Sequence, residues 1–165
     1  MSDSEPEIIV RAAQPCVVIG ETVPMAELGR VAHRIPELFA WLGGHGIEPA
    51  GPPFFKYDVI DMARELTVEV GVAVGSPVPG DGDVVSGTLP GGRYASLTHT
   101  GHPDELEAAT ALLLSWAGER GLRWDMTQTS AGEAWGCRLE FYKSDPATEP
   151  DMSRWETELA FRLAD

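Results

Sequence analysis

The sequence predicts an α+β fold, in which a duplicated strand–helix–strand–strand unit forms an antiparallel-rich curved sheet with two helices on one face and a ligand cleft on the other. Two observations predict it. Segments with alternating apolar residues flank two segments with helical spacing, and this order occurs twice in 165 residues. Matching residues also recur in order: Trp41 and Gly46 with Trp116 and Gly121 at an offset of 75, Tyr57 with Tyr142 at 85, and Glu69 with Glu158 at 89.

The first unit is expected over about residues 6–75. Its opening strand, "EIIVRAAQPCVVIGETV", is interrupted near Pro15. A helix follows within residues 24–46, with Pro36 predicting a kink or a break and the glycines at 43, 44 and 46 ending it. Its apolar face has three- and four-residue spacing and consists of Leu28, Val31, Ile35, Leu38 and Leu42. The strands "PFFKYDVI" and "LTVEVGVAV" complete the unit.

Residues 75–83, "GSPVPGDGD", are rich in Gly and Pro and predict a linker. The second unit, about 84–163, opens with the strand "GRYASLTHT". A helix is expected from Pro103 to Gly121, because proline and acids suit a first helical turn and glycine suits the end. The strands "GCRLEFYKS" and "WETELAFRL" follow. We expect one domain over residues 1–165, with the opening "MSDSEPEI" as a frayed acidic tail.

Composition excludes several classes of function. Twenty-six acids against 12 bases give a net charge of −14, which argues against direct DNA binding and weakly favours a cationic ligand. No apolar run approaches the roughly 20 residues that cross a membrane, and no signal peptide is visible. Cys16 and Cys137 are predicted to be buried, reduced thiols of a cytoplasmic protein. We expect no metal, since His99 and His102 lack zinc-site spacing, and no cofactor, since no nucleotide fingerprint occurs.

The stretch "CRLEFYKSD", residues 137–145, is predicted to be a strand with one acid at its centre. Glu140 is either the floor of a binding cleft or a surface residue paired with Arg138. Alternation places two sets of side chains on opposite faces: Cys137, Leu139 and Phe141, which are expected to meet the helices, and Arg138, Glu140 and Tyr142.

Four stretches of the chain resemble a known family. They are "LPGGRYASLTHTGHPDEL", "LEFYKSDPATEP" and, more loosely, "PFFKYDVID" and "ELTVEVGVAV". The family that they resemble is the GyrI-like small-molecule-binding family, which is related to the effector-binding domains of AraC-type and MerR-type regulators. The resemblance spans nearly the whole chain after residue 5. It implies two repeats forming one curved sheet around an aromatic-lined cleft with a glutamate at its floor. The last strand lacks a proline that such domains often carry, and no helix-turn-helix segment is present, so the regulator role is not implied.

The resemblance assigns Glu140 as the ligand-contacting acid, Tyr142 as one wall and Tyr57 as the opposing wall. The two tyrosines are equally consistent with simple β-propensity. Further ligand-binding candidates are three tryptophans, for which structural packing is the alternative interpretation, and Phe39. The tryptophans are Trp155, Trp116 and Trp41.

Three functions follow as hypotheses. The first is a stand-alone domain that binds small amphipathic, cationic or planar compounds and acts by drug or toxin sequestration. The second is a cofactor-free hydrolase of strained or electrophilic molecules, with Glu140 as general base and Tyr142 orienting the substrate. The third is an acidic protein-interaction module, such as a gyrase-modulating protein.

Overall fold

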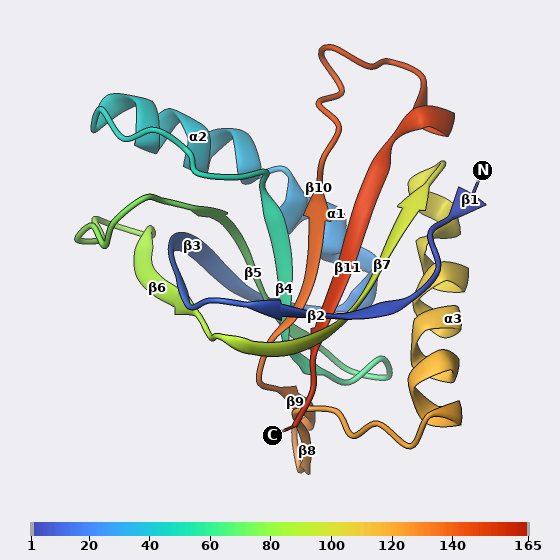
Figure 1. Cartoon of the computed structure of the whole chain (residues 1–165). Coiled ribbons are helices and arrows are strands. Elements are labelled where there is room, and N and C mark those ends of the chain that lie inside the picture. The colour runs from blue at the N-terminus through green and yellow to red at the C-terminus, as the bar shows by residue number, and fades with distance from the viewer. Residues whose placement is uncertain (1, 165) are drawn as a thin grey trace.

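The computed structural model describes residues 2–164, which form one curled antiparallel sheet with its helices on one face (Figure 1). The main path through the sheet runs in the order β1–β7–β11–β10–β4–β5–β3–β6. The strands are β1 Ser2–Asp3, β2 Glu7–Arg11, β3 Gln14–Val23, β4 Phe54–Ile60, β5 Leu66–Ala73, β6 Val85–Leu89, β7 Gly92–Thr100, β8 Met126–Thr129, β9 Gly132–Trp135, β10 Arg138–Tyr142 and β11 Glu156–Arg162. The helices are η1 Met25–Glu27, α1 Leu28–Ala32, α2 Ile35–Gly44, η2 Pro103–Glu105, α3 Leu106–Glu119 and η3 Met152–Arg154.

The order strand–helix–strand–strand occurs twice, as β3, α1–α2, β4, β5 and as β7, α3, β10, β11. The two sets meet where β4 pairs with β10, and there Phe55 lies opposite Glu140. These two positions are 85 residues apart, the same offset that relates Tyr57 to Tyr142, so an approximate two-fold axis passes between them. The duplicated α+β fold class is confirmed, whereas the exact limits of the repeats remain a prediction.

The first helical segment is broken near Pro36, as predicted. α1 ends at Ala32 and α2 begins at Ile35, so Pro36 lies in the first turn of α2, where its missing N–H leaves no helical hydrogen bond unmade. Gly46 and Gly121 follow the two helical segments, and each has φ of 67°, the left-handed conformation that glycine adopts without steric penalty.

Both faces of the sheet carry clusters of buried side chains, which corrects the predicted orientation of one strand. On one face, Val31 and Leu38 of the first helical segment pack on Ile19 and Phe55, and α3 packs on its own half of the sheet. On the other face the sheet curls over itself, and in Figure 1 β2 crosses in front of the central strands. Cys137, Leu139 and Phe141, predicted to meet the helices, lie within this curl.

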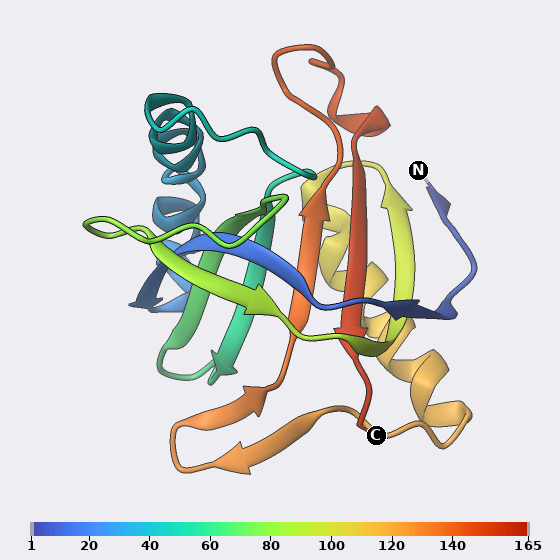
Figure 2. The ribbon, with the colours of Figure 1, turned by 60° about the vertical axis from the view of Figure 1, so that its left-hand side comes forward.

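The physical reason for the error is that a curled sheet covers its own second face. An alternating strand then has apolar neighbours on both sides, and alternation alone does not indicate which side meets the helices. The curl is plain in Figure 2, where β2 and β6 pass across the central strands.

The sequence patterns did not predict several short strands. β6 pairs with β3, and β8 and β9 form a hairpin that pairs with β4. The opening residues, expected to be a frayed tail, include β1, which pairs with β7 and brings Asp3 against His99. These segments are short, polar or glycine-containing, and therefore carry little of the alternation that predicts a strand.

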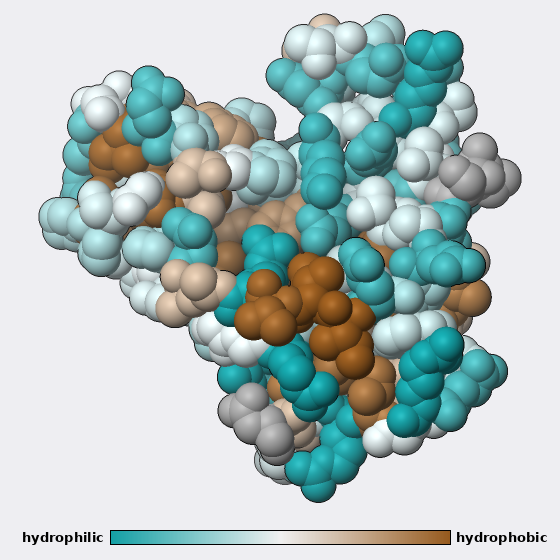
Figure 3. Space-filling view, viewed as in Figure 1, coloured by the Kyte–Doolittle hydropathy of each residue, from teal (hydrophilic) through white to brown (hydrophobic). Residues whose placement is uncertain are grey.

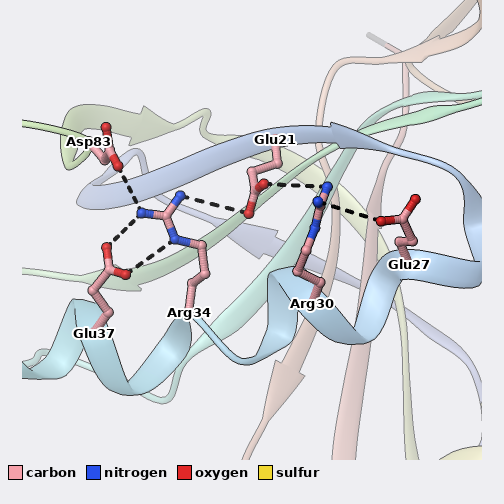
Figure 4. A network of polar contacts seen from close by, with 6 residues as sticks. All are labelled: Glu21, Glu27, Arg30, Arg34, Glu37 and Asp83. Atoms are coloured by element: carbon pink, nitrogen blue, oxygen red, sulfur yellow. Dashed lines mark hydrogen bonds and ion pairs between the residues drawn. The ribbon is translucent and has the colours of Figure 1, made fainter.

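The predicted linker, residues 75–83, contains no helix or strand but is tied to the helices at its end. Arg34, between α1 and α2, contacts Asp83 at 2.9 Å, Glu37 of α2 at 2.7 Å and Glu21 of β3 at 3.7 Å. Arg30 joins the same network through Glu21, as Figure 4 shows. The network fastens the exposed end of the linker to the first helical segment.

The surface seen in Figure 3 has an apolar patch where β2 crosses the sheet. Ile8 and Val10 are exposed there, whereas Ile9 between them packs against the core inside the curl. Both cysteines are free and buried, as predicted. Among residues 2–164, no helix has the length and apolar character needed to span a membrane.

Candidate ligand-binding site

A cavity of about 540 Å³ lies above the junction of the two repeats, between the start of the first helical segment and the start of α3. Its base is formed by β4, β5 and β10, and its rim by η1, η2 and α3. The lining residues are Met25, Tyr57, Ile60, Met62, Leu66, Pro103, Asp104, Leu106, Glu107, Thr110, Arg138 and Glu140.

The cavity lies on the face that carries the helices, and not on the opposite face where the cleft was expected. The two helical segments pack on separate halves of the sheet, with α2 against β5 and α3 against β7. The central strands between them therefore stay uncovered and form the base of the cavity. On the opposite face, Leu139 and Phe141 are buried within the curl of the sheet.

Glu140 is one of the residues that line this cavity. It lies at the middle of β10, between β4 and β11, and only 9% of it is exposed. One carboxylate oxygen accepts a hydrogen bond of 2.9 Å from the hydroxyl of Tyr142. Burial raises the pKa of Glu140 above its ordinary value, while Tyr142, Arg138 and Tyr57 lower it in part. The effect of burial thus exceeds that of these neighbours, and the charged form of Glu140 is less stable here than in water.

Of the two tyrosines predicted to form the walls of the cleft, one lines the cavity and the other does not. Tyr57 lines the cavity, and its ring stacks on Phe55 at 5.5 Å between centroids. Tyr142 is not among the lining residues; its ring meets Phe55 edge-on at 6.3 Å, and its hydroxyl points to Glu140. Burial raises the pKa of both phenols well above the ordinary value, so both keep their proton.

Arg138 is a lining residue that the sequence interpretation assigned only as a surface partner of Glu140. Its guanidinium carbon lies 4.7 Å from the ring centroid of Trp135, 4.5 Å from that of Phe161 and 5.9 Å from that of Tyr57. Its Nε is buried without a hydrogen-bond partner, and burial lowers its pKa. Among the residues described, no ion pair joins Arg138 to Glu140.

The structure does not bring the other predicted ligand-binding residues to this cavity. Trp155 donates its indole N–H to the carbonyl of Glu149 at 2.7 Å, in the loop before β11. Trp116 packs against the α3 core and beneath Arg120, at 4.4 Å. Trp41 stacks on His45 at 4.1 Å, and both Trp41 and Phe39 pack against the core cluster that contains Leu38. Trp41 and Trp116 thus pack against the core, the alternative interpretation for the tryptophans, and Phe39 packs against the core as well.

Sequence reasoning also missed the apolar walls. Met25 and Met62 are exposed at the rim, whereas Leu66 is buried at the base. No periodic signal marks rim residues, because they come from turns and helix starts. For Arg138 the sequence did carry a signal, since alternation along the strand placed it on the same face as Glu140. Over residues 2–164, no group of His, Cys, Asp and Glu suited to a metal ion is found.

Comparison with known proteins supports a binding domain. The family model of the GyrI-like small molecule binding domain matches residues 4–164. Among curated proteins, no sequence matches the chain.

Three proteins of known structure are similar in fold over nearly the whole chain. The EcmrR C-terminal domain has a TM-score of 0.74 and 17% identity, with 98% of each chain covered. In the EcmrR–DNA complex (TM-score 0.76, 17% identity), 98% of this chain aligns but spans only 57% of the EcmrR chain. SAV2435 bound to tetraphenylphosphonium has a TM-score of 0.67 and 10% identity, covering 98% of this chain and 94% of its own. A hydrolase from Listeria innocua has a TM-score of 0.58 and 14% identity, covering 97% and 92%. At these identities the likeness shows the fold alone.

Proposed function

Because this chain belongs to the GyrI-like small-molecule-binding family, we propose that it binds small amphipathic or planar organic cations in the cavity above Glu140 and acts in the cytoplasm by sequestering drugs or toxins. The observation that supports the proposal is that a buried carboxylate, Glu140, lines a cavity together with Tyr57 and several apolar side chains. In such a site water competes poorly for the charge, so an organic cation is attracted more strongly than at the surface.

The walls supply the remaining affinity. Tyr57 presents a ring beside the acid, where aromatic stacking and cation–π attraction act together. Asp104 and Glu107 are exposed acids that line the cavity, and they add a negative potential that draws cations toward it. SAV2435, a protein of similar fold, is described bound to tetraphenylphosphonium, which is an organic cation with aromatic rings.

Calorimetry with a matched pair of planar ligands tests the proposal. We expect 10-methylacridinium, a permanent cation, to bind the wild-type protein, and Glu140→Gln to weaken that binding by about 1–3 kcal/mol. Acridine in its uncharged form has nearly the same shape and should bind both proteins alike. Equal binding of the cation to both proteins would show that Glu140 is not the floor of the site.

A second candidate function is hydrolysis without a cofactor. The observation that favours it is the raised pKa of Glu140, since a carboxylate becomes a better general base as its pKa approaches the working pH. Glu140 would take a proton from a water molecule that attacks a strained or electrophilic carbon. In an epoxide the ring C–O bond would break as the new C–O bond forms, and the released alkoxide would take up a proton. Product formation from a simple epoxide such as styrene oxide, lost in Glu140→Gln while the epoxide still binds, would support this function. Binding with no product favours sequestration.

A further inference from the structure

The cavity also contains a positively charged group, whose role the binding of a simple cation does not explain. Arg138 is a lining residue, and of the twelve residues that line the cavity it alone carries a positive charge. Aromatic rings surround its guanidinium, and its Nε lacks a hydrogen-bond partner. Within residues 2–164 the structure gives the guanidinium no ion pair. The Nε–H group of Arg138 is therefore available to donate a hydrogen bond to a ligand.

Arg138 and Glu140 are two separate charged groups within one cavity. They lie on the same face of β10 two residues apart, and two residues of extended strand span roughly 7 Å. Tyr57 faces both, with its ring 5.9 Å from the guanidinium carbon of Arg138. The carboxylate of Glu140 is instead held by Tyr142, at 2.9 Å. The two charges therefore do not cancel by direct contact, and each remains available to a different part of a ligand.

We propose that the cavity selects amphoteric aromatic compounds, whose acidic group binds Arg138 while the cationic centre binds Glu140. This inference rests on the proposed function, because it assigns the second end of the same ligand. Arginine suits the role, since its planar fork of N–H donors matches a carboxylate in a bidentate arrangement. The rings of Trp135 and Phe161 hold that fork in place, so little side-chain freedom is lost when the acid binds.

A pair of dyes that differ only in the acid tests the proposal. Rhodamine 110 carries a free carboxylate, and rhodamine 123 is its methyl ester, a cation without the acid. We expect Arg138→Met to weaken rhodamine 110 binding by about tenfold or more, the loss of a hydrogen-bonded charged partner. Rhodamine 123 binding should change by less than about twofold. Fluorescence anisotropy measures both.

Arg120→Met provides a matched control. Arg120 also lies over a tryptophan ring, that of Trp116 at 4.4 Å, but it is not a lining residue. The control removes the same charge and should leave both dyes unaffected. Thermal unfolding checks that each variant folds. Should Arg138→Met fail to fold, Arg138→Lys keeps the charge but loses the fork, and a selective loss of rhodamine 110 binding is still expected.

The outcomes separate this proposal from the function on which it rests. Equal weakening of both dyes by Arg138→Met would mean that Arg138 only supports the wall, and no weakening would mean that it plays no part; either result overturns the proposal. If rhodamine 123 binds the wild-type protein in either case, the proposed function survives. Failure of both dyes to bind the wild-type protein contradicts the proposed function itself.

Discussion

The hydroxyl of Tyr142 donates a hydrogen bond of 2.9 Å to the carboxylate of Glu140, two residues earlier on the same strand. A hydrogen bond of this kind favours the charged form of the acid, and it opposes the effect of burial. Tyr142 is thus placed to keep Glu140 available as an anion, although it does not line the cavity.

Tyr142→Phe removes this donor and keeps the ring against Phe55. The pKa of Glu140 should rise further, because its charged form loses a hydrogen bond. We expect binding of 10-methylacridinium at neutral pH to weaken by up to about tenfold, with acridine unaffected. Calorimetry on both ligands checks this. Weakened binding of the neutral compound as well would indicate that the phenol has a direct contact with the ligand.

The affinity for a permanent cation should depend on pH. The pKa of Glu140 is raised by burial, so the acid loses its proton at a higher pH than an ordinary glutamate. The anion is the form that attracts the cation, so affinity should increase as pH rises through this pKa and then level off. Titrations between roughly pH 5 and roughly pH 9 test this, and Glu140→Gln should flatten the curve. A pH profile unchanged in that variant would assign the titration to another group.

Glu69 should make the protein less stable as pH rises. It lies beside Lys56 and Asp58, and burial first, then Asp58, raise its pKa from 4.5 to about 7. Between these two values the folded protein binds more protons than the unfolded chain, so the free energy of unfolding falls with increasing pH. Glu69→Gln should remove up to about 3 kcal/mol of this decline.

Urea denaturation of the wild type and Glu69→Gln at a series of pH values measures the effect of Glu69. The two curves of stability against pH should diverge between pH 4.5 and about 7 and run parallel outside that window. Parallel curves throughout would show that Glu69 titrates normally.

The linker should tolerate added length near its start. Gly75 and Ser76 are exposed, so four Gly/Ser residues inserted between them should lower stability by less than about 1 kcal/mol, since the entropy of loop closure grows slowly with length. The control is the same insertion between Asp83 and Val84. Val84 is buried, and its backbone is hydrogen-bonded to that of Asp81, so we expect a larger loss of stability there. Equal losses at both places would mean that the start of the linker is packed as well.

Local sequence signals predicted the main elements because each has a clear physical cause. The spacing of Leu38 and Leu42 marks a helix, Pro36 marks the break before it, and Gly46 and Gly121 mark the ends of the two helical segments. The acid at Glu140 stands out because a buried strand rarely carries one. These features depend on residues close together in the chain.

Features that depend on distant parts of the chain were not predictable in this way. The side on which Leu139 lies is decided by β2 and β6, which curl across the sheet from elsewhere in the sequence. Trp41 and Trp116 have apolar surroundings whether they line a core or a cleft, so their residue type does not distinguish the two. The environment of Arg138 comes from Trp135 and Phe161, on two other strands.

The pairing of Phe55 with Glu140 bears on how this protein arose. In a dimer of two identical chains, residues that face each other across a two-fold axis are the same, so a glutamate there would face a second glutamate at a distance where like charges repel. Once both copies are encoded by one gene, each can mutate alone. An acid beside a phenyl ring at the centre of the sheet is an arrangement that gene fusion permits and that identical subunits exclude.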